Sequence, residues 1–137
     1  MIVVVDTNVL VSGLLSPFGP PAQIARMIAC GDLRLCFNAA ILSEYETVLG
    51  RSRFRFSLDT VEELVEYIQT FGILVSPRPL PAPLPDPDDE VFLEVAKSGA
   101  AECLVTGNLR HFPKKRRCGV RVLSPREFID FFRSSAS

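Results

Sequence analysis

Short apolar runs alternate with longer amphipathic segments along the whole chain. The runs are rich in Val, Ile, Leu and Cys, and they predict strands at Ile2–Val5, Leu33–Phe37, Ile73–Val75, Cys103–Thr106 and Val120–Leu123. Segments of helical period predict helices at Asn8–Leu15, Pro20–Cys30, Ala39–Gly50, Leu58–Phe71, Asp88–Ser98 and Pro125–Phe132. Apolar strands that alternate with helices are typical of a parallel sheet covered on both faces. We therefore expect a three-layer α/β/α sandwich with a central, mostly parallel sheet of four or five strands.

The segment before the helix predicted at Asp88–Ser98 has proline at every second position from Pro77 to Pro87. Such a run is neither helix nor central strand, because proline lacks the amide hydrogen and fixes φ; it should lie extended, near polyproline II. A ligand for an SH3-type domain is one interpretation. We favour a stiff connector that places Asp86, Asp88 and Asp89 at the start of the next helix, since a rigid arm loses little entropy on folding.

Length and composition indicate a globular protein. The 137 residues fit one domain, residues 1–137, and 47% hydrophobic with 23% charged residues is ordinary globular usage. The longest apolar stretches are much shorter than the roughly 20 residues of a membrane helix. The N-terminus lacks the basic flank and long apolar core of a secretory signal. We therefore expect no membrane span and a cytoplasmic location.

Net charge and cysteine content argue against a globally basic nucleic-acid-binding surface and against a zinc site. The net charge of −1 gives no global attraction to nucleic acid, so any attraction must come from local patches. The four cysteines include no C-x-x-C pair, and the chain has a single histidine, which argues against a zinc site. We expect free thiols rather than disulfides, because a chain of this size builds an adequate core without them.

Acidic and amide side chains follow four of the predicted strands. Asp6 comes directly after the first strand and Asn108 closely follows the fourth. Glu44 lies in the helix after the second strand, while Asp88 and Asp89 open the helix after the third. Ligands of open parallel sheets bind beyond the carboxyl ends of the strands. These side chains should therefore meet at one edge of the sheet.

Each of these residues has an ordinary structural interpretation. Asp6, Asp88 or Asp89 could be helix N-caps, and Glu44 could be a solvated helix residue. Taken together, these interpretations are less satisfactory, because an unpaired carboxylate after an apolar strand costs several kcal/mol when buried. Carboxylates brought close together also repel one another unless a cation neutralises them. A bound metal ion explains the whole set.

Hard oxygen ligands suit Mg²⁺ or Mn²⁺, and one or two such ions could acidify a bound water and stabilise charge on a phosphodiester. The chain has no G-x-S-x-G elbow and no phosphate-binding glycine loop. Hydrolysis by a metal-activated water is therefore the chemistry that the residues favour.

Five blocks of sequence, in this order, resemble the PIN domain, and more narrowly the bacterial PIN proteins related to VapC that act as toxins of toxin–antitoxin pairs. The blocks are Val5-Asp6-Thr7-Asn8, Glu44 within a helix, Asp86-Pro87-Asp88-Asp89-Glu90, Thr106-Gly107-Asn108 followed by His111-Phe112, and Ser124-Pro125. The resemblance covers essentially the whole chain. It implies a parallel α/β/α sandwich and a metal-dependent endoribonuclease that hydrolyses RNA.

The resemblance also implies roles for individual residues. Asp6, Glu44 and Asp89 match the family's three acidic catalytic and metal-binding positions. We prefer Asp89 to Asp88 because Ala96 follows it by seven residues, as the family's helix pattern requires, although Asp88 remains a close competitor.

The position of Asn108 often holds Asp in the family. An asparagine there offers a neutral oxygen ligand or an amide that positions water, and it makes one metal ion a simpler expectation than two. Thr7, Asn8 and Thr106 match polar positions that orient carboxylates or bound water.

Two features near the fourth strand have more than one interpretation. His111 could be a general acid or a phosphate contact, but a histidine at the start of a loop is more often structural. A dense basic run follows, formed by Lys114, Lys115, Arg116 and Arg117. This run is a solvated loop, an RNA-binding rim, or a surface for an acidic antitoxin segment.

Our leading hypothesis is a metal-dependent ribonuclease with an antitoxin partner. The family usually forms homodimers, and the apolar cluster of Phe128, Ile129, Phe131 and Phe132 exceeds what one core-facing stripe needs. The alternative is a catalytically silent binding module, which Asn108 would permit. A phosphatase of the haloacid dehalogenase type is disfavoured, because it requires Asp where Asn8 stands. A receiver domain is disfavoured too, because Asp6 has no acidic neighbour.

Overall fold

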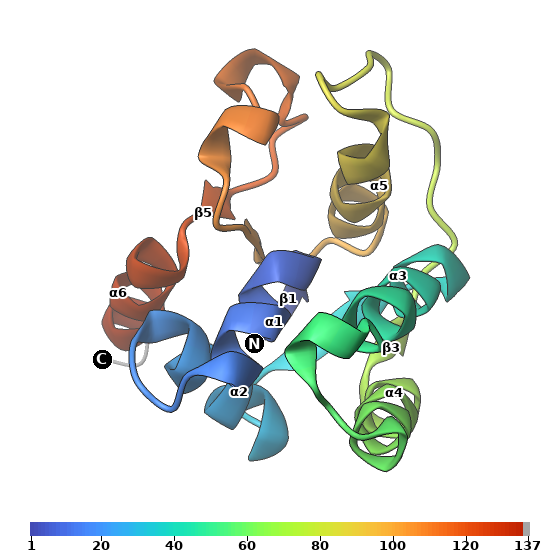
Figure 1. Cartoon of the computed structure of the whole chain (residues 1–137). Coiled ribbons are helices and arrows are strands. Elements are labelled where there is room, and N and C mark those ends of the chain that lie inside the picture. Colours follow the sequence, from blue (N-terminus) through green and yellow to red (C-terminus); the bar gives the residue numbers. More distant parts are fainter. Residues whose placement is uncertain (136–137) are drawn as a thin grey trace.

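A five-stranded, all-parallel sheet forms the centre of the computed structural model, which describes residues 1–135 (Figure 1). The strands are β1 (Ile2–Val5), β2 (Arg34–Phe37), β3 (Ile73–Leu74), β4 (Cys103–Val105) and β5 (Val122–Leu123), in the order β3-β2-β1-β4-β5. Val3, Val4 and Val5 are all fully buried. Because successive residues of a strand point to opposite faces, this burial requires both faces of the sheet to be covered. The predicted α/β/α class is confirmed.

Within residues 1–135, six helices surround this sheet (Figure 1). They are α1 (Thr7–Leu15), α2 (Pro20–Ala29), α3 (Ala39–Leu49), α4 (Leu58–Phe71), α5 (Glu90–Ser98) and α6 (Pro125–Ser135). Helix α5 packs against the three neighbouring strands β2, β1 and β4. Within residues 1–135, no helix combines the length and apolar composition that crossing a membrane requires.

Most predicted elements are present with small shifts at their ends. Strand β5 begins at Val122 rather than Val120, because only its two residues pair with β4. Strand β4 ends at Val105, one residue before Thr106. Helix α5 begins at Glu90 rather than Asp88, because a 3₁₀ turn, η2 (Pro87–Asp89), precedes it. The predicted ends of β2, β3, α1, α2, α3 and α6 differ by one to three residues from those observed.

The proline-rich connection contains no helix or strand over residues 75–86, as its sequence predicts. It is anchored near its end: the Leu84 side chain is buried, and its backbone N–H donates to the Glu90 carboxylate at 2.9 Å. The connection therefore reaches α5 with its last residues held in place.

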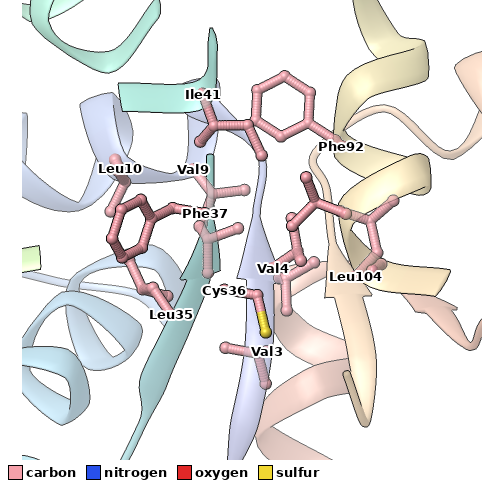
Figure 2. Close-up of a cluster of buried hydrophobic side chains, with 14 of the residues drawn as sticks. Val3, Val4, Val9, Leu10, Leu35, Cys36, Phe37, Ile41, Phe92 and Leu104 are labelled. Atoms are coloured by element: carbon pink, nitrogen blue, oxygen red, sulfur yellow. The ribbon is translucent and has the colours of Figure 1, made fainter. Parts of the chain in front are cut away.

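One cluster of buried side chains joins the sheet to the helices (Figure 2). It includes Cys36 from β2, Ile41 from α3 and Phe92 from α5. All four cysteines are free, and burial raises the pKa of Cys103 to about 12, so this thiol stays protonated within the core.

Helices α1 and α2 approach closely at Gly13. A Cβ atom at this position would lie 2.5 Å from the backbone oxygen of Pro21 and 3.1 Å from the Ala25 Cβ atom. Glycine is thus required here by the packing of two helices rather than by its backbone conformation.

We predict that Gly13→Ala lowers the free energy of unfolding by about 1–2 kcal/mol, since overpacking outweighs the gain of about 1 kcal/mol in helix propensity. Urea denaturation measures the change. Ser12→Ala, on the exposed face of the same helix, is the control and should be neutral or slightly stabilising. Equal stability of both variants would contradict the close approach.

Candidate functional site

Asp6 is held at the carboxyl end of the sheet by the pairing of β1 with β4. Its backbone N–H donates to the Val105 carbonyl at 2.9 Å, and only 6% of the residue is exposed. Asp6 occupies the N-cap position of α1, but its side chain makes no capping hydrogen bond. A helix cap is therefore not the reason for this buried carboxylate.

Thr106 fixes the orientation of the Asp6 carboxylate. This fully buried residue follows β4, and its Oγ1 donates to Asp6 Oδ2 at 2.8 Å. The same Oγ1 accepts the backbone N–H of Asn108 at 3.1 Å. One hydroxyl thus connects the ends of β1 and β4 to the loop that follows.

Glu44 reaches the same end of the sheet from α3. Thr7 Oγ1 donates a hydrogen bond to Glu44 Oε2, and the next helix residue, Tyr45, donates its hydroxyl to the Val5 carbonyl. Tyr45 is fully buried, so it fastens α3 to the end of β1. Partial burial raises the pKa of Glu44, and repulsion from Asp6 adds to this effect, while the Thr7 hydrogen bond opposes it.

Asp89 is buried, whereas its neighbour Asp88 is exposed. The Asp89 Oδ2 atom has no hydrogen-bond partner of good geometry among the described residues, although His111 Nδ1 lies 2.9 Å away. Burial, followed by repulsion from Asp6, raises the pKa of Asp89 to about 6. Asp88 instead donates its backbone N–H to Asp86 Oδ1 at 3.0 Å.

The three carboxylates Asp6, Glu44 and Asp89 thus share one electrostatic condition. Burial raises the pKa of each, and repulsion from Asp6 raises the pKa of the other two further. A divalent cation among them would relieve both effects, and carboxylate oxygens are the donors that Mg²⁺ and Mn²⁺ prefer. The residues therefore fit such an ion.

His111 lies closer to the carboxylates than its sequence position suggests. The 3₁₀ turn η3 (Leu109–His111) directs its ring between two site residues: Nδ1 faces Asp89, and Nε2 lies 2.8 Å from Asn108 Nδ2. Asp86 also joins this group, with one donor atom from each of Asp86, Asp89 and His111 lying within 4.8 Å of the others. Sequence reasoning did not select Asp86, although the Asp-Pro-Asp-Asp block contains it.

Of the remaining predicted residues, Asn8, Lys114, Lys115 and Arg116 are exposed and Arg117 is partly buried. Asn8 lies at the start of α1, while Lys114, Lys115 and Arg116 form the 3₁₀ turn η4 (Lys114–Arg116) beyond His111. Arg117 is held by its Nε–H, which donates to the Phe112 carbonyl at 2.8 Å. Figure 1 shows the connection after β4 (orange) facing the end of the proline-rich connection (yellow). The basic run is therefore on the side of the molecule that contains the carboxylates.

The sequence matches one family model and one curated relative. A family model for the PIN domain matches residues 2–110. The uncharacterized protein MJ1680 of Methanocaldococcus jannaschii is 27% identical over 141 residues, which cover 95% of this chain and 90% of the relative. The match extends over nearly the whole length of both proteins.

Two solved structures have a similar fold. The structure of FitAB bound to the IR36 DNA fragment has a TM-score of 0.61 at 14% identity, covering 91% of this chain and 95% of that one. The crystal structure of FitAcB from Neisseria gonorrhoeae has a TM-score of 0.57 at 17% identity, covering 92% and 99%. At these identities the similarity establishes the fold alone.

The raised pKa of Asp89 predicts how the stability of the metal-free protein depends on pH. The pKa is about 6 in the folded state against an ordinary 3.8, so the folded state binds the proton more tightly than the unfolded state. Stability should therefore fall as the pH rises from about 4 to about 7. Asp89→Asn removes this loss, and we expect it to raise Tm at pH 7.5 by about 3–6 °C.

Thermal unfolding in EDTA at pH 5 and pH 7.5 measures this effect, and the gain from Asp89→Asn should shrink at pH 5, where the wild-type carboxyl is mostly protonated. Asp88→Asn is the matched control, because the neighbouring carboxylate is exposed and its removal should change Tm little. A destabilised Asp89→Asn variant at pH 7.5 would show that the charge is already compensated.

Proposed function

Because the chain belongs to the PIN domain family, we propose that it is a metal-dependent endoribonuclease that hydrolyses RNA phosphodiesters, the toxin of a toxin–antitoxin pair. Asp6, Glu44 and Asp89 are the proposed metal-binding and catalytic residues. The observation that carries the proposal is their convergence: three carboxylates from separate segments share one sheet edge, and each has a pKa raised by burial. Such a cluster is costly unless a cation occupies it.

The chain's own residues would hold and orient the reacting groups. A bound Mg²⁺ or Mn²⁺ supplies an acidified water and a positive charge opposite the phosphate. Thr106 fixes one oxygen of Asp6, and Thr7 fixes one oxygen of Glu44, so each carboxylate has a second oxygen to offer. Asn108 contributes an amide where an acid is frequent in the family, which favours one ion at this carboxylate set.

We predict that the purified protein cleaves RNA with Mg²⁺ or Mn²⁺ and that EDTA abolishes cleavage. Asp6→Asn and Glu44→Gln should each lower kcat at least about hundredfold, since even the loss of a group that only orients a ligand costs about 10–100-fold. Gel assays on single-stranded RNA measure the rate. Asp130→Asn, at an exposed position on α6, is the control for loss of one negative charge and should keep full activity.

Cleavage that persists in EDTA would contradict this proposal, and so would an Asp6→Asn variant that cleaves RNA at the wild-type rate. The competing function is a catalytically silent module of the same fold, which Asn108 favours because it removes one acidic ligand. Calorimetry separates the two: a silent module would show no heat of binding with Mg²⁺ or Mn²⁺.

The basic run is the proposed RNA contact. Lys114, Lys115 and Arg116 are exposed and begin three residues after His111. They would therefore contact an RNA strand that enters the carboxylate cluster. They also supply the local positive charge that a chain of net charge −1 needs in order to attract RNA. Arg117 belongs to the same run, although its contact with Phe112 gives it a structural role as well.

Replacing Lys114, Lys115 and Arg116 together with alanine should raise KM for RNA about tenfold at physiological salt with little change in kcat. The slope of log KM against log salt should also become shallower, because fewer counterions are released. Loss of three exposed cations elsewhere, Arg78, Lys97 and Arg133, is the control. An unchanged KM together with weaker antitoxin binding would assign the run to the protein partner instead.

A protein partner and a cytoplasmic location belong to the same proposal. Leu15 and Phe18, at the end of α1 and in the turn after it, are 52% and 83% exposed, which supports a binding surface there for an antitoxin. A homodimer has weaker support than the sequence indicates. Phe128 and Ile129 are buried, and Phe131 and Phe132 pack against the core of the same chain.

A further inference from the structure

A second group of cations lies in the turn between α3 and α4 (Figure 1, green). Arg51, Arg53 and Arg55 are exposed there, whereas Phe54 and Phe56 are half-buried. We call the three cations the arginine turn. Within residues 1–135, none of them forms an ion pair with a carboxylate. On a chain of net charge −1, they therefore form a local positive surface without direct acidic partners.

A hydrogen bond and two aromatic rings fix the arginine turn to the helices. The Phe54 N–H donates to the Arg51 carbonyl at 3.1 Å. The rings of Phe54 and Phe56 stack with their centroids 6.1 Å apart. Phe56 also lines an apolar cavity together with Leu10 of α1 and Leu49 of α3. The phenylalanines therefore anchor the turn, while the arginine side chains face water.

Arg53 is positioned by its neighbour Phe54. The guanidinium carbon lies 4.8 Å from the centroid of the Phe54 ring, so one face of this planar group is covered. The residue is exposed, and the other face of the guanidinium remains open to solvent. Unpaired RNA bases stack on such planes. Arg53 is therefore suited to hold an unpaired base, which the compact ammonium group of a lysine is not.

The order of the strands puts the arginine turn and the basic run in connections that flank Asp6. Strands β2 and β4 pair with β1 on its two sides. The arginine turn follows α3, the helix after β2, whereas η4 of the basic run follows β4. Asp6 directly follows β1. The strands on both sides of this carboxylate therefore lead into connections that contain exposed cations.

The arginine turn also lies near a second carboxylate, that of Glu44. Arg51 follows Glu44 by seven residues, which corresponds to two helical turns or about 10 Å along a helix axis. Burial is the largest effect on the pKa of Glu44 and raises it, while the positive charge of Arg51 opposes this rise. A phosphate held by Arg51 would therefore lie close to the carboxylates of the proposed metal site.

The helix dipole offers an ordinary explanation for part of this charge. A cation at the end of a helix is favourable in itself, because it faces the negative end of the dipole. This effect is confined to the last turn of the helix, so it accounts for Arg51 but not for Arg53 or Arg55. The outward position of all three arginines requires a further reason.

We propose that the arginine turn is a second contact for single-stranded RNA, with Arg51 and Arg55 on phosphates and Arg53 on an unpaired base. The RNA then crosses the carboxylates between the arginine turn and the basic run. This inference rests on the proposed function and adds the form of the RNA and its path. A single strand suits the surface because its bases are open to stacking, whereas those of a duplex are not.

Fluorescence anisotropy with a labelled oligouridylate in EDTA measures RNA binding without metal-dependent cleavage. Replacing all three residues of the arginine turn with glutamine should raise Kd at least about tenfold. The slope of log Kd against log salt should become shallower by about 1.4, since each of two phosphate contacts on a single strand contributes about 0.7. The control removes three exposed cations elsewhere, through Arg78→Gln, Lys97→Gln and Arg133→Gln. A triple variant that matches this control in Kd and in slope overturns the proposal.

Two further measurements address the stacked base and the folding of the variants. Arg53→Lys keeps the charge and should weaken binding with an unchanged salt slope; an unchanged Kd overturns the stacking role of Arg53. Photo-crosslinking of the wild type to thiouridine-containing RNA needs no variant. It should label peptides from residues 51–56 as well as from residues 114–117. Crosslinks confined to residues 114–117 overturn the second contact.

The outcomes for this inference and for the proposed function are separable. RNA binding that depends on the arginine turn, in a protein that cleaves no RNA, would support the inference and refute the proposed function. Metal-dependent cleavage with KM unchanged in the triple variant would overturn the inference and leave the proposed function intact. Unchanged RNA binding with weaker antitoxin binding would assign the arginine turn to the protein partner, which overturns the inference as well.

Discussion

The burial of carboxylates at one edge of the sheet is the constraint on which this site depends, and repulsion from Asp6 adds to it for Glu44 and Asp89. The pKa values of Asp6, Glu44 and Asp89 are all raised, and burial is the largest cause for each. Solvation of the charged carboxylates would be most favourable if these side chains turned toward water. The fold prevents this, because Asp6 follows β1, which pairs with β4, while Glu44 lies on α3, which packs on β2, and Asp89 lies in η2, which packs on α5. The unfavourable charge is therefore built into the scaffold.

The scaffold holds the carboxylates through neutral groups. Thr7 and Thr106 each donate a hydroxyl to one of them, and Tyr45 binds the Val5 carbonyl directly before Asp6. Hydroxyl donors orient a carboxylate without neutralising it, so they leave its charge available to a cation. An arginine in these places would satisfy the same oxygens and remove the reason for binding a metal. Threonine at both positions thus orients the carboxylates at the edge of the sheet and preserves their charge for the proposed cation.

The sequence predicted what depends on local pattern. Apolar runs and helical periodicity located the strands and helices, and the positions of Asp6 and Asn108 after parallel strands placed both at one edge of the sheet. The spacing to Ala96 favoured Asp89 over Asp88, and the structure buries the first and exposes the second. The contact between His111 and Asp89 was not predictable in this way. It requires two irregular loops to approach each other, and neither periodicity nor strand position determines where such loops meet.

Asn108 links His111 to the rest of the edge. An aspartate at this position would add a further negative charge beside Asp6 and Asp89, and it would compete with Asp89 for the imidazole of His111. The amide instead contacts Nε2 and leaves Nδ1 directed at the buried Asp89 Oδ2. Its backbone N–H meanwhile satisfies Thr106, the residue that orients Asp6. A neutral residue after β4 therefore adds no charge beside Asp6, while it contacts both the histidine ring and the hydroxyl that orients the Asp6 carboxylate.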